Sequence, residues 1–260
     1  MTSPPRESTA NYPSLIDRVV LVTGGGSGIG AAVVRAFAQQ RSRVAFLDGV
    51  DEASEKLVAH LAGEGRPRPR YLHCDLRDIA ALRSAITEVE RTLGPIDVLV
   101  NNAANDDRHE FDVVEPAYFD DRIAINLRHY FFAIQAVRGA MARNGGGSIV
   151  NLGSIAWRLK LPGIPVYATA KAAIEGMTKA LACELGPQRI RINCIEPGYV
   201  ATERQKKLWL TPEFEAKVRA GQCLPDIIEP GSIADMVLFL ASDQGRMCTR
   251  QTFVVDGGWT

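Results

Sequence analysis

Seven short runs of apolar, mostly β-branched residues recur along the chain, and segments with helical patterning separate them. They lie at residues 18–22, 44–47, 70–73, 97–100, 147–151, 191–195 and 251–255. Strands that lack a polar face are buried on both sides, and helical connections allow neighbouring strands to run in parallel. We therefore predict an α/β fold whose seven-stranded parallel sheet is flanked by helices.

The rest of the chain offers no repeat or linker that would split this pattern, which predicts one domain over residues 15–260. Residues 1–14 contain three prolines and no apolar core, so we expect a flexible tail there, neither a signal peptide nor a membrane anchor. The chain has 30 basic and 30 acidic residues, a balance that argues against a nucleic-acid or membrane partner. The basic segment 66–70 contains two prolines and is interpreted as a solvated turn.

The cysteines and histidines predict neither a disulfide framework nor a metal site. The five cysteines are scattered without a C-x-x-C pair, and the four histidines show no ligand spacing. Reduced thiols in a cytoplasmic protein are the simplest interpretation.

A glycine-rich turn follows the first predicted strand. Residues 23–30 read Thr-Gly-Gly-Gly-Ser-Gly-Ile-Gly, and the helix-forming segment 31–38 comes next. Glycines allow the backbone to approach a pyrophosphate, which then lies at the positive end of the helix. A tight loop would also use glycines, but the strand, turn and helix order favours a dinucleotide site in a Rossmann-like, doubly wound domain.

Acidic residues after the second and third strands are expected to contact the adenosine half of that dinucleotide. Asp48 ends the second strand, where a carboxylate accepts hydrogen bonds from ribose hydroxyls and repels a 2′-phosphate, so NAD is favoured over NADP. Asp75 is placed to meet the adenine amino group. The alternative is that Asp75 caps the next helix, a role for which Asp78 competes. Asn102 and Ala103, after the fourth strand, leave room for the adenosine and can satisfy exposed backbone groups.

Tyr167 and Lys171 stand four residues apart in a predicted helix, and Ser154 lies thirteen residues before the tyrosine. Residues at this spacing share a helix face. A lysine cation would stabilise a phenolate and lower a phenol pKa of about 10, which would make Tyr167 a usable base. The pair alone is weak support, because solvated helix faces often carry one.

Taken together, these motifs resemble the short-chain dehydrogenase/reductase family from about residue 15 to 260. The matching residues are Thr23, Gly24, Gly28, Gly30, Asn101, Asn102, Ala103, Asn126, Ser154, Tyr167, Lys171, Pro197, Gly198 and Thr202. Ala104 stands where the family usually has glycine. The resemblance implies that Tyr167 removes the hydroxyl proton, Ser154 orients the substrate and Lys171 also bonds the nicotinamide ribose. It further implies that Asn126 holds a water that links Lys171 to solvent.

The resemblance also extends the expected cofactor site. The residues expected to contact NAD are Gly24, Ser27, Gly28, Ile29, Asp48, Asp75, Leu76, Asn102, Ala103, Tyr167, Lys171, Pro197, Gly198, Val200 and Thr202. Residues 199–226 are rich in charged and aromatic side chains, and we expect a substrate lid there. A fixed helical hairpin on the surface is the alternative.

The helix that begins at Tyr167 is rich in small residues, and Gly176 in its interior costs about 1 kcal/mol relative to alanine. Close approach of another helix would compensate. In the resembling family this helix and the one around Asn126 pair across a dimer axis, often within a tetramer, so we expect a homo-oligomer. Packing onto its own sheet is the competing explanation.

Polar loops surround the predicted base and suggest a polyhydroxylated substrate. Carboxylates and amides pair with hydroxyl groups, and an aromatic face covers the apolar side of a sugar ring. The loop 105–109 is alternatively a solvated surface loop. This loop, together with residues 126–129 and 222–224, resembles the bacterial NAD-dependent aldose dehydrogenases, closest to those acting on D-xylose. Expected substrate contacts are Asn105, Asp106, Ser154, Trp157 and Tyr199.

Two rival functions are less consistent with the sequence than sugar oxidation. A 3-oxoacyl thioester reductase of the same family would use NADPH and a longer apolar channel, which Asp48 and the acidic pair Asp106 and Asp107 oppose. A non-catalytic NAD-binding regulator would keep the fold and lose the chemistry. The intact set of Tyr167 and Lys171 with Ser154 argues against it.

Overall fold

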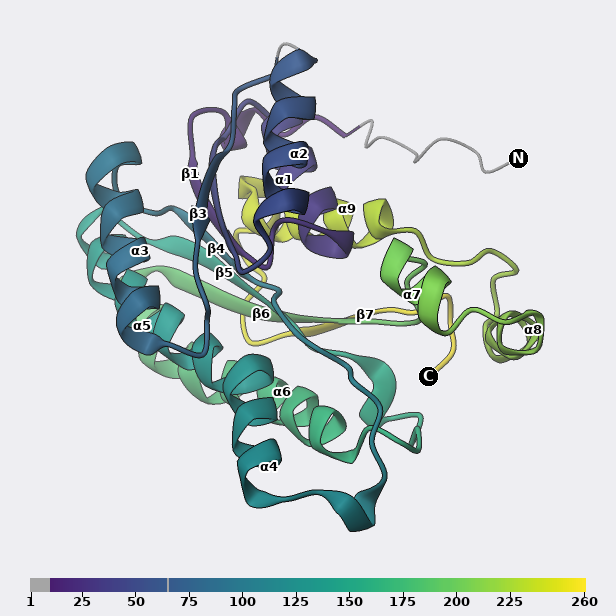
Figure 1. Ribbon diagram of the computed structural model, residues 1–260. Coiled ribbons are helices and arrows are strands. Elements are labelled where there is room, and N and C mark those ends of the chain that lie inside the picture. Colours follow the sequence, from purple (N-terminus) through teal and green to yellow (C-terminus); the bar gives the residue numbers. More distant parts are fainter. Residues whose placement is uncertain (1–9, 65) are drawn as a thin grey trace.

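The computed structural model describes residues 10–64 and 66–260 and confirms the predicted Rossmann-like sheet (Figure 1). The sheet has seven strands in the order β3-β2-β1-β4-β5-β6-β7, and every neighbouring pair is parallel. The strands are β1 Val19–Thr23, β2 Arg43–Asp48, β3 Arg70–His73, β4 Val98–Asn101, β5 Gly147–Leu152, β6 Ile190–Pro197 and β7 Thr252–Val255.

Helices cover both faces of the sheet (Figure 1). They are α1 Gly28–Gln39, α2 Asp51–Gly63, α3 Ile79–Leu93, α4 Pro116–Ile123, α5 His129–Arg143, α6 Pro165–Leu185, α7 Glu203–Leu208, α8 Pro212–Gly221 and α9 Pro230–Ala241. Apolar residues of α1, α2 and α9 form the core on one face, and those of α3, α5 and α6 form the core on the other. Because both faces are covered, the central strand β1 is buried along its whole length.

The strand order reverses between β1 and β4, and this reversal positions the site. The register places Thr23, the last residue of β1, beside Leu47 and Asn101, and Asn101 beside Asn151. These strands therefore end close to one another at one edge of the sheet. In open parallel sheets, ligands bind beyond this carboxyl edge at such a reversal of the strand order.

The packed part of the chain begins earlier than the predicted boundary at residue 15. Residues 1–9 of the predicted tail lie outside the described residues. Pro13–Leu15 form a short 3₁₀ helix, the backbone N–H of Tyr12 donates to Gln40 Oε1 (2.7 Å), and Asp243 N–H donates to Ser14 Oγ (3.1 Å). Buried Leu15 and partly buried Tyr12 both pack in the core beside α1, which explains why this segment joins the domain.

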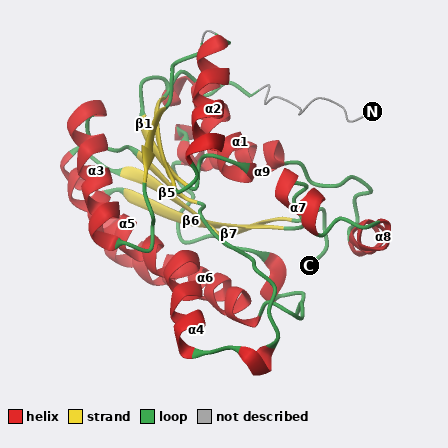
Figure 2. Cartoon of the chain, viewed as in Figure 1, coloured by secondary structure: helices red, strands yellow, loops and turns green. Residues whose placement is uncertain are grey.

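The segment predicted as a lid contains two helices, α7 and α8, which lie at one end of the molecule (Figure 2). Each is capped by a threonine, since the backbone N–H of Gln205 donates to Thr202 Oγ1 and that of Phe214 donates to Thr211 Oγ1. Their helical secondary structure agrees with the alternative interpretation of this segment as a helical hairpin. Their closure over a substrate stays a prediction.

Across residues 10–64 and 66–260, no helix is long and apolar enough to cross a membrane. In the same residues, no group of three or more His, Cys, Asp or Glu side chains is arranged to hold a metal ion.

Candidate active site

A cavity of about 790 Å³ opens at the carboxyl edge of the sheet, and α7 and α8 contribute to its wall. It brings together side chains that are far apart in the sequence. The predicted residues that line it are Gly24, Ser27, Gly28, Ile29, Asp48, Asp75, Leu76, Asn102, Ala103, Asn105, Asp106, Ser154, Tyr167, Lys171, Pro197, Gly198, Tyr199, Val200 and Thr202. Trp157 and Asn126 are not among the lining residues.

Two positions in the glycine-rich turn can be occupied only by glycine. Gly24 has φ +66°, a left-handed conformation that L side chains rarely adopt. A Cβ atom on Gly30 would lie 1.9 Å from the carbonyl oxygen of Gly24. Ser27, the N-cap of α1, makes no side-chain cap hydrogen bond within the described residues, so the first turn of α1 faces the cavity with open donors. This cradle suits a pyrophosphate.

Asp48 is already positioned by the turn that it faces. Its two carboxylate oxygens accept hydrogen bonds from the backbone N–H groups of Gly26 and Val50, both at 2.9 Å. A carboxylate held in this way has lone pairs left for ribose hydroxyls. Asp48 therefore has a structural role in the turn, and its contact with a ribose stays a prediction.

Asp75 does not cap a helix, so the alternative interpretation of this residue is wrong. Asp78 is the N-cap of α3 and accepts from the backbone N–H groups of Ala80 and Ala81. Asp75 instead pairs with Arg77 (2.7 Å), and the hydrogen bond from Arg77 lowers the pKa of Asp75. Its carboxylate remains on the wall of the cavity.

Asn102 fastens the end of β4 to the glycine-rich turn, as the sequence suggested for these amides. Its side-chain Nδ2 donates to the carbonyl oxygens of Thr23 (3.1 Å) and Gly24 (2.8 Å), and its backbone N–H donates to Thr23 Oγ1 (3.0 Å). The turn is thereby held from both sides.

Tyr167 and Lys171 lie one turn apart on α6, and the Lys171 Nζ atom is 5.7 Å from the centre of the Tyr167 ring. Lys171 is 2% exposed, and this burial lowers its pKa to about 7. The sequence predicted a lowered pKa for Tyr167. In the structure, burial and then the charge of Asp106 raise it, and the hydrogen bond with Ser154 and the charge of Arg108 oppose them only in part. Lys171 directs its hydrogen bonds to Leu152 and Tyr130 instead.

Asn126 occupies a π-helical turn, Ala124–Arg128, and its side chain holds the loop predicted to bind substrate. Its Oδ1 accepts from the backbone N–H of Asn105 (2.8 Å), and its Nδ2 donates to the carbonyl oxygens of Asn105 (3.0 Å) and Arg122 (2.9 Å). The side chain is fully buried. Asn126 therefore shapes the cavity by fixing Asn105 and does not itself line the cavity wall.

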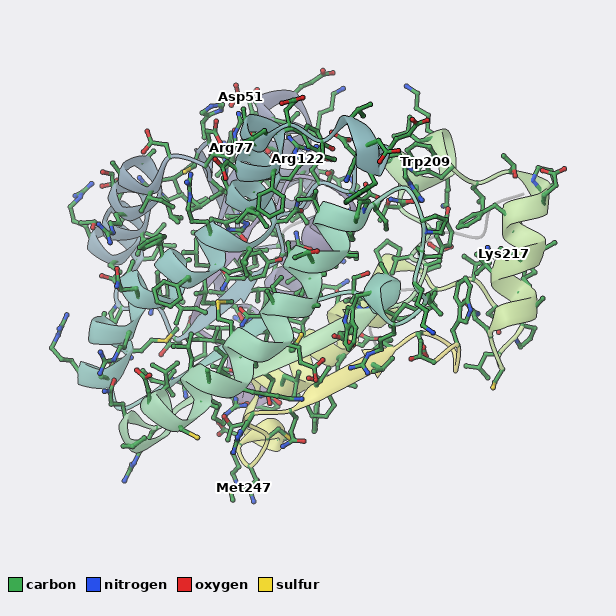
Figure 3. The ribbon with its side chains drawn as sticks, turned by 90° about the horizontal axis from the view of Figure 1, so that it is seen from below. Asp51, Arg77, Arg122, Trp209, Lys217 and Met247 are labelled. Atoms are coloured by element: carbon green, nitrogen blue, oxygen red, sulfur yellow. The ribbon has the colours of Figure 1, made fainter. Side chains whose placement is uncertain are left out.

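The loop 105–109 meets α7 through charged and amide groups. Gln205 Nε2 donates to Asp106 Oδ2 (2.7 Å), and Arg204 Nη2 donates to Asp107 Oδ1 (2.8 Å). The Arg108 guanidinium stacks on the Trp209 ring at 4.8 Å, at the end of α7 (Figure 3). Loop and helix therefore form one wall, and the alternative of a free, solvated loop does not describe it.

Trp157 and Glu196 bind each other at a distance from the cavity. Trp157 follows Ser154 in a 3₁₀ turn, its Nε1 donates to Glu196 Oε1 (3.0 Å), and Arg158 donates to the other oxygen (2.6 Å). Glu196 is fully buried, and these bonds satisfy its charge. Trp157 thus braces the turn that carries Ser154.

Tyr199 does line the cavity, and its ring packs edge-on against Phe214 of α8 at 5.1 Å. Within the described residues its hydroxyl is buried without a hydrogen-bond partner, which leaves a polar group for a ligand to satisfy.

The lining residues that were not predicted from the sequence include Arg108, Gln205, Phe214 and Trp259. Arg108 and Gln205 adjoin residues that were predicted, so their neighbourhood was the available signal. Trp259 comes from the C-terminal segment, which carries no recognisable motif.

Comparison with known proteins gives full-length matches. The sequence profile described as Enoyl-(Acyl carrier protein) reductase matches residues 24–260. A D-xylose 1-dehydrogenase of Caulobacter vibrioides is 51% identical over 252 residues, covering 97% of this chain and 99% of the relative. A probable galactose dehydrogenase of Rhizobium meliloti is 49% identical over 250 residues, covering 96% and 98%. A solved short-chain dehydrogenase/reductase from Serratia marcescens superposes with a TM-score of 0.88 at 31% identity, covering 95% and 99%.

Proposed function

The chain belongs to the short-chain dehydrogenase/reductase family, and from that premise we propose that it oxidises the anomeric hydroxyl of an aldose to the aldonolactone with NAD. D-xylose is the first candidate, followed by related pentoses, D-galactose and deoxyhexoses. The two aldose dehydrogenase relatives support this substrate class.

The observation that carries the proposal is the meeting of three groups in one cavity. Ser154 and Tyr167 lie on its wall together with the polar loop that holds Asp106. A hydroxyl group beside Tyr167 would have both an orienting serine and a proton acceptor in reach. A neighbouring sugar hydroxyl would find the carboxylate of Asp106 and the amide of Gln205.

The residues of the cradle fit NAD. The first turn of α1 and the glycines before it would hold the pyrophosphate, and Asp48 would accept hydrogen bonds from the adenosine ribose. A 2′-phosphate would meet that carboxylate, which favours NAD over NADP. Asp75 and Leu76 would border the adenine, and Pro197 to Thr202 would border the nicotinamide. When bound, NAD would supply the acceptor for the hydride that leaves the carbinol carbon.

Tyr167 acts as the general base in this proposal. It takes the proton of the anomeric hydroxyl while Ser154 keeps that oxygen in place. Because burial raises the pKa of Tyr167, proton removal requires the positive charge of Lys171 nearby. Asn126 would hold the water that connects Lys171 to solvent, in addition to fixing Asn105.

Helix α7 serves as the substrate lid. Its contacts with Asp106 and Asp107 close the cavity over the substrate and exclude water. Of the predicted sugar contacts, Asn105, Asp106, Ser154 and Tyr199 lie on the wall. Gln205 joins them in this proposal, and Trp157 acts by bracing Ser154.

We also propose an even-numbered homo-oligomer and a cytoplasmic location. Gly176 supports the first: it is exposed on α6, and a Cβ atom there would meet no described atom within 4 Å, so packing on its own sheet does not explain it. The cysteines support the second. Each is free, and Cys183 and Cys223 are exposed, as suits a reducing compartment.

The test is NADH absorbance with a panel of pentoses, hexoses and their deoxy analogues, each with NAD and with NADP. We expect turnover of at least one aldose with NAD preferred, and loss of turnover in Tyr167→Phe. An acetoacetyl thioester with NADPH serves as the contrasting substrate. Oxidation of no aldose would overturn the sugar assignment, and full activity of Tyr167→Phe would overturn the assigned base.

A further inference from the structure

A second tyrosine contacts Lys171 from another helix. Tyr130, on α5, is completely buried. Its hydroxyl donates to the carbonyl oxygen of Leu152 (3.1 Å) and accepts a hydrogen bond from Lys171 Nζ (3.1 Å). Lys171 Nζ also donates to the Leu152 oxygen, at 2.7 Å. The three groups close a small hydrogen-bonded ring between α5, α6 and the end of β5.

We propose that Tyr130 is a positioning residue for Lys171, whose hydroxyl oxygen holds the ammonium group in place and keeps it charged beneath Tyr167. This inference rests on the proposed function only for its catalytic consequence. The contact itself is a property of the folded chain.

The Tyr130 hydroxyl oxygen is important because of the groups that surround the Lys171 ammonium. The ammonium has three N–H donors, of which one is bound by Leu152 and one by Tyr130, which leaves the third for the cavity that Lys171 lines. Both acceptors are uncharged. A buried cation without a carboxylate partner relies on such acceptors, because each unpaired donor of a desolvated charge is costly.

The other titratable groups that face Lys171 do not replace Tyr130. Burial lowers the pKa of His129 to about 4 and raises the pKa of Cys194 to about 12, so both are neutral near pH 7. Burial also raises the pKa of Tyr167, and this residue faces Lys171 with its ring, the centre of which lies 5.7 Å from Nζ. Against the dominant effect of burial, the charge of Asp106 raises the pKa of Lys171, and within the described residues Lys171 makes no hydrogen bond to that carboxylate.

Tyr130→Phe removes the oxygen and keeps the ring that packs with Ile174 and Cys194. Loss of a hydrogen bond to a charged group corresponds to a roughly tenfold to hundredfold change in an equilibrium constant. We therefore expect the pKa of Lys171 to fall by about one unit or more. In catalysis we expect kcat near pH 7 to fall about tenfold with the sugar KM within about twofold.

The direct measurement is competitive acetylation with acetic anhydride between pH 5 and 10, with the Lys171 peptide quantified by mass spectrometry. In Tyr130→Phe, Lys171 should become reactive at a lower pH than in the wild type. Thr178→Val is the matched control, because it removes another buried hydroxyl, one on α6 that accepts from Asn151 Nδ2. Its Lys171 titration and kcat should equal those of the wild type.

An unchanged Lys171 titration in Tyr130→Phe would overturn the proposal, whatever happens to stability. If Tyr130→Phe does not fold, Tyr130→Gln and Tyr130→Met form a second pair, which differ in a hydrogen-bond acceptor at similar length. The Gln variant should titrate closer to the wild type, and equal titration of the two would overturn the proposal. Because acetylation needs no substrate, the result is independent of the aldose assignment.

Discussion

Burial makes the charge of Lys171 depend on pH near neutrality, and this couples the protonation of Lys171 to folding. Its pKa is about 7 in the folded chain, against 10.5 as the ordinary value. Between these values the unfolded chain binds more protons, so folding becomes more favourable as pH rises. The stability gain is complete above the ordinary pKa and is lost as pH falls through the folded pKa.

Lys171→Met removes this titration and leaves the other groups in place. We expect the free energy of unfolding of the wild type, relative to that of the variant, to increase steadily from pH 6.5 to pH 9.5. Urea unfolding at a series of pH values measures it. A difference that stays constant with pH would mean that Lys171 keeps an ordinary pKa in the folded chain.

Two substitutions of Asp48 test its predicted role in cofactor choice and separate that role from its structural role in the turn. Asp48→Asn removes the charge and keeps one of the two oxygen acceptors that Gly26 and Val50 use, whereas Asp48→Ala removes the charge and both acceptors. We expect both variants to raise the ratio of NADP to NAD efficiency, roughly tenfold or more, because the repulsion of a 2′-phosphate is lost. The Ala variant should bind NAD more weakly than the Asn variant, because it loses both acceptors that hold the turn.

Steady-state kinetics with each cofactor gives the ratios. Asp78→Asn, which alters the cap of α3 outside the cavity, is the control and should leave the ratio unchanged. Cofactor choice that is the same in both Asp48 variants and the wild type would remove Asp48 from this role.

Single residues show where prediction from sequence ends. The positions of Asp48, Asn102 and Tyr167 follow from strand ends and helix spacing, so their places on the cavity could be predicted. The position of the Trp157 side chain could not be predicted, because its direction depends on a 3₁₀ turn and on a buried partner, Glu196, which lies 39 residues later in the sequence. Such partners are chosen by tertiary packing, which no local pattern records.

Among the elements, the buried strands were the most predictable, and the lid was the least. A strand of apolar residues differs in pattern from both neighbouring helices, and the predicted runs overlap all seven strands. The charged segment 199–226 allowed both a lid and a fixed hairpin. Its helices α7 and α8 have capping threonines, Thr202 and Thr211, and these were the signals available in the sequence.

Helix α7 is attached to the loop 105–109 by polar contacts between partly exposed side chains, and such contacts are individually weak. In the pair Arg204 and Asp107, the side chains are 50% and 47% exposed. Exposed pairs contribute about 1 kcal/mol or less. We expect Arg204→Met to raise the sugar KM by about fivefold or less, with a smaller effect on kcat, and to speed proteolysis within α7.

Lys206→Met is the control, because Lys206 forms its ion pair with Glu203 on the same helix. Kinetics at low and high salt and limited proteolysis provide the measurements. The wild-type KM should rise with salt toward that of Arg204→Met. Equal effects of the two substitutions would show that general charge, and not the contact with Asp107, governs the lid.

At the scale of the whole molecule, the sheet order assembles the site. Residues from Gly24 to Trp259 reach one cavity because β1, β4, β5 and β6 end at the same edge. The sequence predicts the parallel sheet and its carboxyl edge, and therefore most of this wall. It does not predict how far α7 and α8 fold back over the edge, since that depends on contacts such as Gln205 with Asp106.

The outer surface of α5 and α6 carries the remaining expectation, that of a homo-oligomer. Phe131 on α5 is 44% exposed, and Gly176 on α6 leaves open space where a side chain would stand. In a monomer, Gly176→Leu would stabilise α6, because glycine is unfavourable inside a helix. In an assembly that packs α6 closely against a second copy, the same substitution would separate the subunits.

We therefore expect light scattering to give an even multiple of the chain mass for the wild type and a smaller mass for Gly176→Leu. Gly63→Leu is the matched control, because Gly63 ends α2 and also has open space around it. It should keep the wild-type mass. A wild-type monomer, or equal masses for the Gly176→Leu and Gly63→Leu variants, would show that this face is not the interface. A Gly176→Leu variant that is monomeric but more stable would show that Gly176 is needed for assembly and not for folding.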